Sequence, residues 1–199
     1  MDAFASEHAV YWTYRLSALG GSLDEVVHDG VKDGTMTGTL ESGGQVAHVR
    51  VVLDGKVYLE GNVPGLAELE NFVIPAAEKE AGKWIAVARS SSYFAAYAVN
   101  LTVASAVEEL YLGGTVRALP PTTLDGVSVL AVRESVTSKG NPITETIYIR
   151  ASGSPLPLKV LLAVGGVSGT IVYGPWGKAP AAKVPSKSTP LKGTWVTKA

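Results

Sequence analysis

The side chains best suited to chemistry are three histidines, His8, His28 and His48, and two adjacent acidic pairs, Asp24–Glu25 and Glu108–Glu109. Three imidazoles could ligate zinc, and two carboxyl groups facing each other could serve as general acid and base. The histidines, however, follow no compact ligand spacing. Adjacent residues of a strand or helix also point in different directions. The sequence therefore favours histidines without a metal ion and acidic residues without a catalytic partner.

Other signatures of catalysis are missing from the sequence. The chain has no cysteine, which excludes disulfides, thiolate metal sites and cysteine nucleophiles. It has no nucleophile elbow, zinc-protease motif, phosphate-binding loop or dinucleotide-binding motif. The formal net charge is −1, and the charged residues are scattered rather than gathered into a basic stripe. We predict a protein that is not an enzyme, with no cofactor, no metal ion and no nucleic-acid partner.

One long apolar run, from Tyr93 to Leu112, is unusual in this chain because Glu108 and Glu109 are its only charged residues. A membrane span needs about 20 predominantly apolar residues without interior charge. The two glutamates and the many Ala, Ser and Thr residues argue against a span. We predict a single helix over residues 92–112 that is buried on more than one side and ends at Gly113–Gly114.

Most of the remaining chain alternates between apolar and polar residues with the period of a β-strand. Residues 62–82 instead have helical spacing, interrupted by Pro75. A meander is expected at the N-terminal end, with a tight turn at Asp54–Gly55. The predicted strands cover residues 8–18, 35–42, 45–53, 56–61, 82–88, 126–136, 143–152, 157–164 and 169–174.

The expected organisation is a single α+β domain over residues 1–185, with helices inserted between two β-rich halves of one sheet. From Ala179 the chain is rich in Pro, Lys, Ser and Ala, and residues 186–199 are predicted to form an extended C-terminal tail. No tandem repeat divides the chain.

The order of several short motifs resembles a known family. DGKVYLEGN (54–62) and AGKWIAVA (81–88) precede the apolar run, and LDGVSVLAVRES (124–135) follows it. TIYIRASGSPLPLKVLLA (146–163) and GTIVYGPWGKAPAAKVP (169–185) complete the series. This order is similar to that of the actinobacterial lipoproteins of the LppX/LprG type, which share the fold of the periplasmic carrier LolA.

The resemblance implies a strongly curved antiparallel half-barrel, an unclosed β-barrel with helices packed on its concave face. It also implies a pocket for acyl chains and no catalytic residues. The family is exported and attached to the membrane through an N-terminal lipidated cysteine. Because this sequence contains no cysteine, we expect the signal peptide and lipidated cysteine to have been removed, and the protein to act in the cell envelope outside the cytoplasmic membrane.

The leading hypothesis is a lipid-binding or lipid-carrying domain whose apolar run forms a lid over the sheet. Phe94, Tyr97, Ala98 and Leu101 would line the pocket from the lid. Trp12, Tyr14, Val49 and Val51 would line it from the sheet. For each of these eight residues, ordinary core packing is the alternative.

The other hypothesis is a protein-interaction or sensor module on the same fold, similar to periplasmic regulators that bind an anti-sigma factor. A groove or a sheet edge would then hold a protein segment. Residues 179–199 would be a plausible contact.

Overall fold

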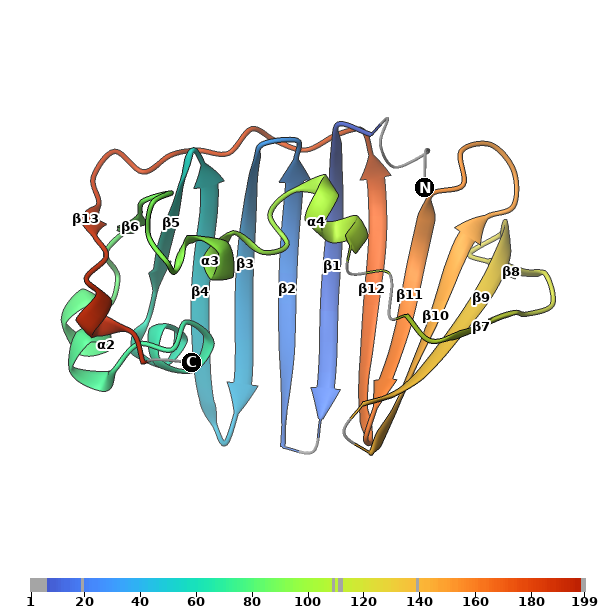
Figure 1. The fold of residues 1–199 in the computed structure, drawn as a ribbon, viewed down its shortest axis with the longest axis horizontal. Coiled ribbons are helices and arrows are strands. Elements are labelled where there is room, and N and C mark those ends of the chain that lie inside the picture. The colour runs from blue at the N-terminus through green and yellow to red at the C-terminus, as the bar shows by residue number, and fades with distance from the viewer. Residues whose placement is uncertain (1–6, 19, 109, 111–112, 139, 198–199) are drawn as a thin grey trace.

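The structure is a computed structural model of the 199-residue chain, and it describes residues 7–18, 20–108, 110, 113–138 and 140–197. These residues form an open, mostly antiparallel 13-stranded sheet with short helices on one face (Figure 1). The predicted open half-barrel is therefore confirmed. The strands are β1 (Ala9–Ala18), β2 (Gly21–Gly30), β3 (Asp33–Ser42), β4 (Gln45–Asp54), β5 (Lys56–Gly61), β6 (Ile85–Val87), β7 (Thr115–Ala118), β8 (Thr122–Leu124), β9 (Val127–Ser138), β10 (Asn141–Arg150), β11 (Pro157–Val164), β12 (Val167–Trp176) and β13 (Thr189–Pro190).

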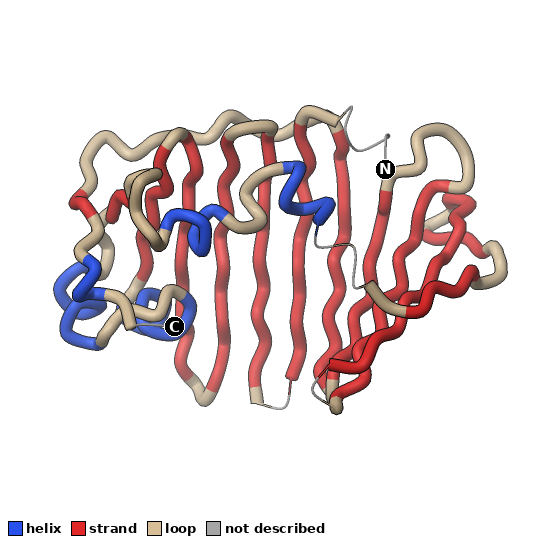
Figure 2. The backbone as a smooth tube through the Cα atoms, viewed as in Figure 1, coloured by secondary structure: helices blue, strands red, loops and turns tan. Residues whose placement is uncertain are grey.

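The strands follow the order β13-β6-β5-β4-β3-β2-β1-β12-β11-β10-β9-β7, and β8 also pairs with β9. The antiparallel pairing of β1 with β12 joins the start of the chain to its later strands. We call β1 to β6 with β13 the first half of the sheet, and β7 to β12 the second half. The helical segments are η1 (Gly65–Leu69, a π-helix), α2 (Ile74–Glu80), α3 (Phe94–Ala98), α4 (Val103–Glu108) and η2 (Gly193–Trp195, a 3₁₀-helix). In Figure 2, α3 and α4 lie over the first half.

Strand register determines which side chains share a face of the sheet. Directly opposed residues of antiparallel strands point to the same side. Trp12 in β1 lies opposite Val27 in β2, and the same row continues through Met36 in β3 to Val51 in β4. We call this the inner face, because α3 contacts β5 and α4 contacts β2 on this side. Val27 and Val51 are at most 2% exposed, so the inner face of the first half is a packed core.

The prediction of a single helix over residues 92–112 is wrong, because the run is divided into α3 and α4. Val99 leaves the helical conformation, and Asn100 has a positive φ of 57°. Thr102 and Ser105 then form a capping box at the start of α4. The Ser105 amide donates to Thr102 Oγ1 at 3.3 Å, and the Thr102 amide donates to Ser105 Oγ at 3.1 Å. This reciprocal pair starts a new helix instead of continuing the old one.

Strand β2 has no counterpart among the strands that the sequence predicts. Its inward positions are Leu23, Glu25, Val27 and Asp29, as their pairing with β1 shows. Two carboxyl groups therefore interrupt the apolar side of the strand, and the alternation that identifies the neighbouring strands is lost. Asp29 is fully buried, and its Oδ2 accepts a hydrogen bond from Trp12 Nε1 at 2.7 Å. This hydrogen bond provides the buried carboxylate with a polar partner.

The last residues of the chain return to the first half of the sheet. Strand β13 pairs in parallel with β6, and the Val73 amide donates to the Trp195 carbonyl oxygen at 2.8 Å. The side chain of Trp195 is buried in the same cluster as the inner-face residues of the first half. Part of residues 186–197, which the sequence assigned to an extended tail, therefore packs on the domain. The division of the chain at residue 185 stays a prediction.

Candidate functional site

The eight residues predicted to line a pocket all belong to one cluster on the inner face. Trp12, Val49, Val51 and Leu101 are buried within it. The other four are half-buried and pack against it: Tyr14, Phe94, Tyr97 and Ala98. The fold therefore brings the eight residues together. Their role in binding a ligand stays a prediction, and core packing accounts for the four that are buried.

A hydrogen bond to the backbone at Glu70 connects this cluster to α3, which is part of the apolar run predicted to form a lid. The Tyr97 hydroxyl in α3 donates to the backbone carbonyl oxygen of Glu70, just after η1, at 2.9 Å. Burial, together with the nearby carboxylate of Glu25, raises the pKa of Glu70 to about 7. The pKa of Tyr97 is raised well above its usual range. Burial is the main cause, and the charge of Glu70 is the second. The lid contact therefore contains a phenol that stays protonated and a carboxyl group that titrates near neutrality.

Replacing Tyr97 with phenylalanine is expected to lower the free energy of unfolding by about 1 kcal/mol, because it removes a part-buried hydrogen bond while keeping the ring. Urea unfolding at neutral pH measures the change. Tyr93→Phe is the matched control, since the Tyr93 hydroxyl makes only a 3.5 Å exposed contact with the Gly193 carbonyl oxygen. Equal losses in the two variants would show that the Tyr97 hydroxyl does not anchor the lid.

The inner face continues across the second half as an apolar surface. Tyr14 lies opposite Ile171 in β12, and the row runs on through Val160 and Ile147 to Val132 in β9. A parallel row contains Val164, Ile143 and Val136. These side chains are half-buried except Val160, which is buried: Ile171, Val160, Ile147, Val132, Val164, Ile143 and Val136. The second half thus has the same apolar character as the first half, but its inner face is less completely packed.

Tyr14 connects the two halves. A Cβ atom on Gly169, its diagonal neighbour in β12, would lie 3.2 Å from Tyr14 Cε2 and 3.4 Å from Leu162 Cβ. The aromatic ring therefore extends over β12 towards β11, in the space left by the missing side chain. Among the eight predicted residues, Tyr14 is the one that this geometry places at the border of the two surfaces.

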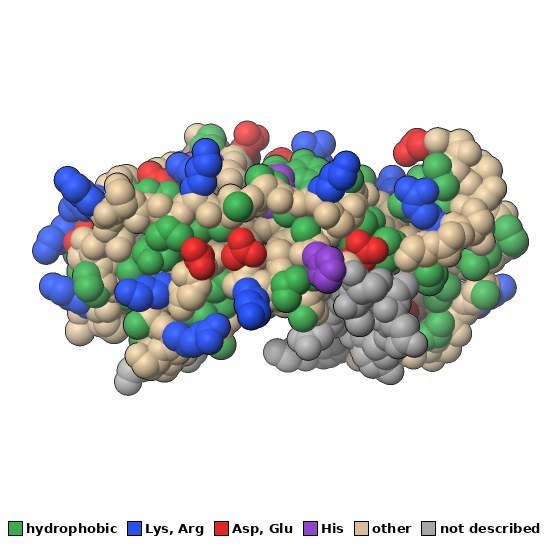
Figure 3. Space-filling view, turned by 90° about the horizontal axis from the view of Figure 1, so that it is seen from above, with side chains coloured by type: hydrophobic (Ala, Val, Ile, Leu, Met, Phe, Trp, Pro, Cys, Tyr) green, Lys and Arg blue, Asp and Glu red, His purple; other side chains and the backbone are tan. Residues whose placement is uncertain are grey.

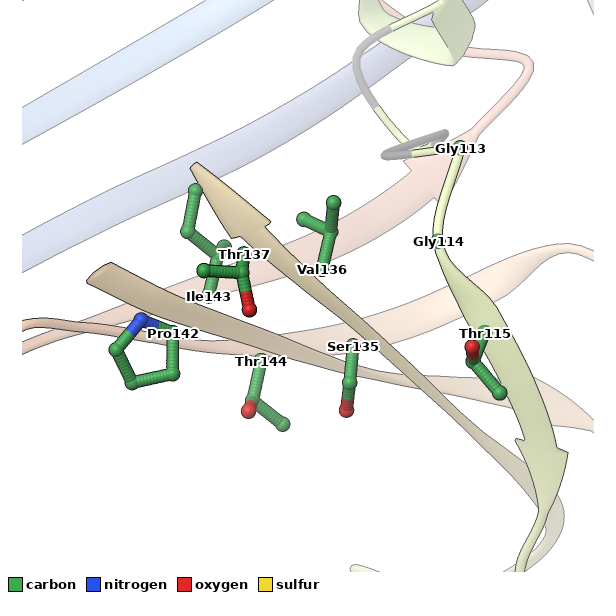
Figure 4. A pocket seen from close by; sticks show the side chains of 9 residues that line it. All are labelled: Gly113, Gly114, Thr115, Ser135, Val136, Thr137, Pro142, Ile143 and Thr144. Atoms are coloured by element: carbon green, nitrogen blue, oxygen red, sulfur yellow. The ribbon is translucent and has the colours of Figure 1, made fainter. Parts of the chain in front are cut away.

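A cavity of about 560 Å³ opens at the end of β9 and β10, next to the segment that leads into β7 (Figure 4). Its lining includes Val136 and Ile143, which lie on the inner face, and also Thr115, Ser135 and Thr144, which lie opposite one another on the outer face. This volume is within the range of small-molecule sites in proteins. The eight predicted residues line neither this cavity nor the other cavities that we describe below.

Sequence reasoning placed the site in the first half and missed the second-half residues. Their alternation was visible in the predicted strands 143–152 and 157–164. What the sequence could not provide was the β1–β12 pairing, which aligns these strands with Trp12 and Tyr14 on one face.

The histidines do not come together as a set of three. His8 and His28 line a cavity of about 240 Å³ with Asp33, below residues 179–181, and a neighbouring cavity of about 520 Å³ contains Tyr11 and His28. Burial lowers the pKa of His28. His48 lies elsewhere, in β4. No group of three or more His, Asp or Glu side chains in the described ranges has an arrangement that could hold a metal ion.

The surface seen from above carries interspersed acidic and basic side chains, without one continuous basic area (Figure 3). Within the described residues, no helix combines the length and the apolar character that crossing a membrane requires.

Comparison of the fold with solved structures finds similar proteins. LprF from Mycobacterium bovis is 13% identical, with a TM-score of 0.57 over 94% of this chain and 93% of that chain. The lipoprotein LppX from Mycobacterium tuberculosis is 14% identical, with a TM-score of 0.48 over 92% and 93% of the two chains. An uncharacterized conserved protein from Thermus thermophilus is 10% identical, with a TM-score of 0.49 over 96% and 94%. The sequence matches no family model and no curated protein. The resemblance to the LppX/LprG type is thus confirmed as a shared fold, which the likeness to LprF shows.

Proposed function

We propose that this protein is a non-catalytic domain of the cell envelope that binds a hydrophobic ligand with acyl-chain character on the inner face of its half-barrel. The observation that supports this most directly is the contrast between the two halves of that face. The first half is sealed by α3, α4 and the C-terminal segment, while the second half presents half-buried apolar side chains next to a cavity of about 560 Å³.

The energetic argument is the burial of apolar surface. Removing apolar area from water contributes about 25 cal/mol per Å² before the costs of association are subtracted. A flexible chain laid across Ile171, Ile147 and Val132 would cover apolar side chains of three strands. A continuous apolar surface of this kind is typical of a site for a ligand with an apolar chain.

The eight residues predicted from the sequence have two roles in this proposal. Tyr14 forms the wall between the core and the ligand surface. Phe94, Tyr97, Ala98 and Leu101 hold the lid segment in place, together with Trp12, Val49 and Val51 beneath them. Movement of α4 would then control access to the second half.

The shared fold with LprF supports a location outside the cytoplasmic membrane, and attachment through a lipidated N-terminal cysteine is part of the same proposal. LppX is itself described as a lipoprotein, which is consistent with this location.

Native mass spectrometry of detergent-free protein, followed by extraction and identification of bound lipids, tests the proposal. We expect a co-purifying acyl-chain species in the wild type and its loss in Leu162→Gln, because Leu162 lies on the inner face opposite Gly169. Leu161→Gln is the matched control, since the adjacent Leu161 points to the outer face and is 36% exposed. Wild-type protein that stays empty when long-chain lipids are added would contradict the proposal.

A protein-interaction module is the second candidate, and the pairing of β13 with β6 favours it. The edge of β6 accepts an extended segment through two backbone hydrogen bonds. The Thr189 amide donates to the Trp84 carbonyl oxygen at 2.9 Å, and the Leu191 amide donates to the Ala86 carbonyl oxygen at 2.8 Å. An edge that accepts a strand within the chain could accept one from a partner. If the protein binds no lipid in the mass spectrometry experiment, the protein-interaction module becomes the leading candidate.

A further inference from the structure

We propose that the outer face of the second half holds a binding site for an oxyanion of the phosphate type, formed by Arg117 in β7 and Arg133 in β9. This face is the side of the sheet opposite the apolar inner face, so the site is separate from the surface proposed for the hydrophobic ligand. The charges of strands β7 to β12, the register of the two arginines and the hydroxyl groups beside them together favour an anion.

Strands β7 to β12 separate their charged residues by face. The acidic residues within these strands are Glu134 and Glu145, which lie directly opposite each other on the inner face. Arg133 precedes Glu134 in β9 and therefore points to the outer face, where Arg117 lies directly opposite it. Lys159 in β11 also points outward. The outer face of these strands is thus basic.

The cross-strand partner of an arginine differs between the two halves of the sheet. In the first half, Arg15 lies opposite Asp24 and forms an ion pair with it. In the second half, Arg133 lies opposite Arg117, and neither makes an ion pair in the part of the chain that the structure describes. Like charges directly opposite each other destabilise a sheet. A bound anion would replace this repulsion by attraction to both guanidinium groups.

Hydroxyl groups lie beside the two arginines on the same face. Thr115, Ser135 and Thr144 form the next row across β7, β9 and β10, and they line the cavity of about 560 Å³. Figure 4 shows the side chains of Ser135 and Thr144 pointing to the same side of the sheet. Arg133 Nε donates to Thr146 Oγ1 at 3.2 Å, which holds this guanidinium group over β10. Neighbouring rows are about 7 Å apart, a distance that an arginine side chain can span.

A phosphate-type anion suits these groups for chemical reasons. The guanidinium group is always charged, and its N–H groups can donate two parallel hydrogen bonds to one phosphate. The neighbouring hydroxyl groups can donate to the remaining oxygens. An uncharged ligand would leave the two guanidinium charges facing each other, so the site should prefer an anion. A free phosphate ion and the phosphate of an anionic lipid headgroup offer the same chemistry, and experiment can distinguish these two sources.

Titration with inorganic phosphate, followed through the backbone amide signals in NMR spectra, tests the site. Chloride keeps the ionic strength constant, so that general screening does not mimic binding. We expect saturable shifts of amides in β7 and β9, and at least about tenfold weaker binding in the double variant Arg117→Gln, Arg133→Gln. Arg15→Gln is the matched control and should bind as tightly as the wild type, because Arg15 already has a carboxylate partner. If the double variant does not fold, Arg117→Gln alone should still weaken binding, since it changes an exposed residue of an edge strand.

Co-sedimentation with vesicles identifies the source of the anion. Vesicles of phosphatidylcholine mixed with phosphatidylglycerol are compared with vesicles of phosphatidylcholine alone. Binding to the anionic vesicles that the double variant loses would identify a lipid headgroup, and binding of inorganic phosphate alone would identify a free ion. A wild-type protein that binds neither, or a folded double variant that binds as tightly as the wild type, would overturn the proposal. Both results would leave the proposed function intact, because co-purification of a lipid concerns the inner face.

Discussion

Replacing Gly34 with alanine is expected to displace the lid segment and to lower the free energy of unfolding by about 2–3 kcal/mol, the upper range for an overpacked core. Gly34 lies on the inner face of β3, opposite Asp29 and Leu53. A Cβ atom there would collide with the backbone carbonyl oxygen of Leu101 and would lie 2.9 Å from its carbonyl carbon. Because the obstructing atoms belong to the backbone, no change of rotamer can relieve the collision.

We expect Gly34→Ala to cost more stability than a local clash would, because the lid backbone also contacts the sheet next to Gly34. Leu101 is a buried member of the core cluster, and Thr102 forms a bridge with Gly30 at the end of β2. The lid backbone is therefore in direct contact with the sheet at two points. Moving it away from Gly34 would withdraw the Leu101 side chain from the core, which adds the cost of a cavity to that of the collision.

Urea unfolding and protection of the lid amides from hydrogen exchange measure the two consequences of Gly34→Ala. Gly193→Ala is the matched control, because a Cβ atom at Gly193 meets only Tyr93 Cε2, at 3.8 Å, which is an ordinary contact. The free energy of unfolding of the control should differ from that of the wild type by less than about 1 kcal/mol. A Gly34→Ala protein with unchanged stability and protection would show that the lid is not seated on the sheet in solution.

The sequence predicts strands well where one face is uniformly apolar. In strand β4 every inward position from Ala47 to Leu53 is apolar, Val49 and Val51 among them, and the Asp54–Gly55 turn that follows it places Gly55 at a φ of 66°. Strand β2 was missed for the opposite reason. Glu25 and Asp29 occupy inward positions that normally hold apolar residues, so the period of two cannot be recognised.

The candidate site was only partly predictable. Its first-half cluster depends on local sequence pattern, whereas its second-half surface depends on the pairing of distant strands. Tyr97 and Leu101 belong to the same cluster as Val49 and Val51, and the sequence anticipated this from the apolar character of their segments. The break between α3 and α4 was also encoded locally, in Thr102 and Ser105 at capping-box spacing. The second-half surface depends instead on the register between β1 and β12, which lie far apart in sequence. In a hairpin the turn fixes the register of the two strands. No turn joins β1 to β12, so their register could not be predicted in this way.

The free energy of unfolding is expected to fall by about 3 kcal/mol as the pH rises from about 4.5 to about 7, through the ionisation of Glu70. The side chain is buried, and its pKa is raised from 4.5 to about 7. In the unfolded chain Glu70 loses its proton near pH 4.5, whereas in the folded protein it keeps the proton until about pH 7. Below the lower value both states are protonated, and above the higher value both are ionised, so the change is confined to this interval.

Glu70→Gln should remove this pH dependence, because glutamine resembles the protonated carboxyl group and does not titrate. The variant is expected to match the wild type near pH 4 and to exceed its stability by about 3 kcal/mol near pH 8. Urea unfolding across this range measures both curves. Glu68→Gln is the control, since Glu68 lies two residues earlier and is exposed. Parallel curves for Glu70→Gln and the wild type would mean that Glu70 is ionised in the folded protein throughout the interval.

The variant Glu25→Gln separates the two causes that raise the pKa of Glu70, burial and the charge of Glu25. Burial is the larger cause and the carboxylate of Glu25 the smaller one, so removing the charge of Glu25 should lower the pKa of Glu70 only part of the way towards 4.5. The fall in stability would then end at a lower pH but would not disappear. If Glu25→Gln abolished the pH dependence, repulsion between the two carboxylates would be the main cause, and Glu70 would have to be more hydrated than its burial beneath the lid indicates. Such hydration would also weaken the case for a sealed first half, because Glu70 is only 6% exposed in the structure.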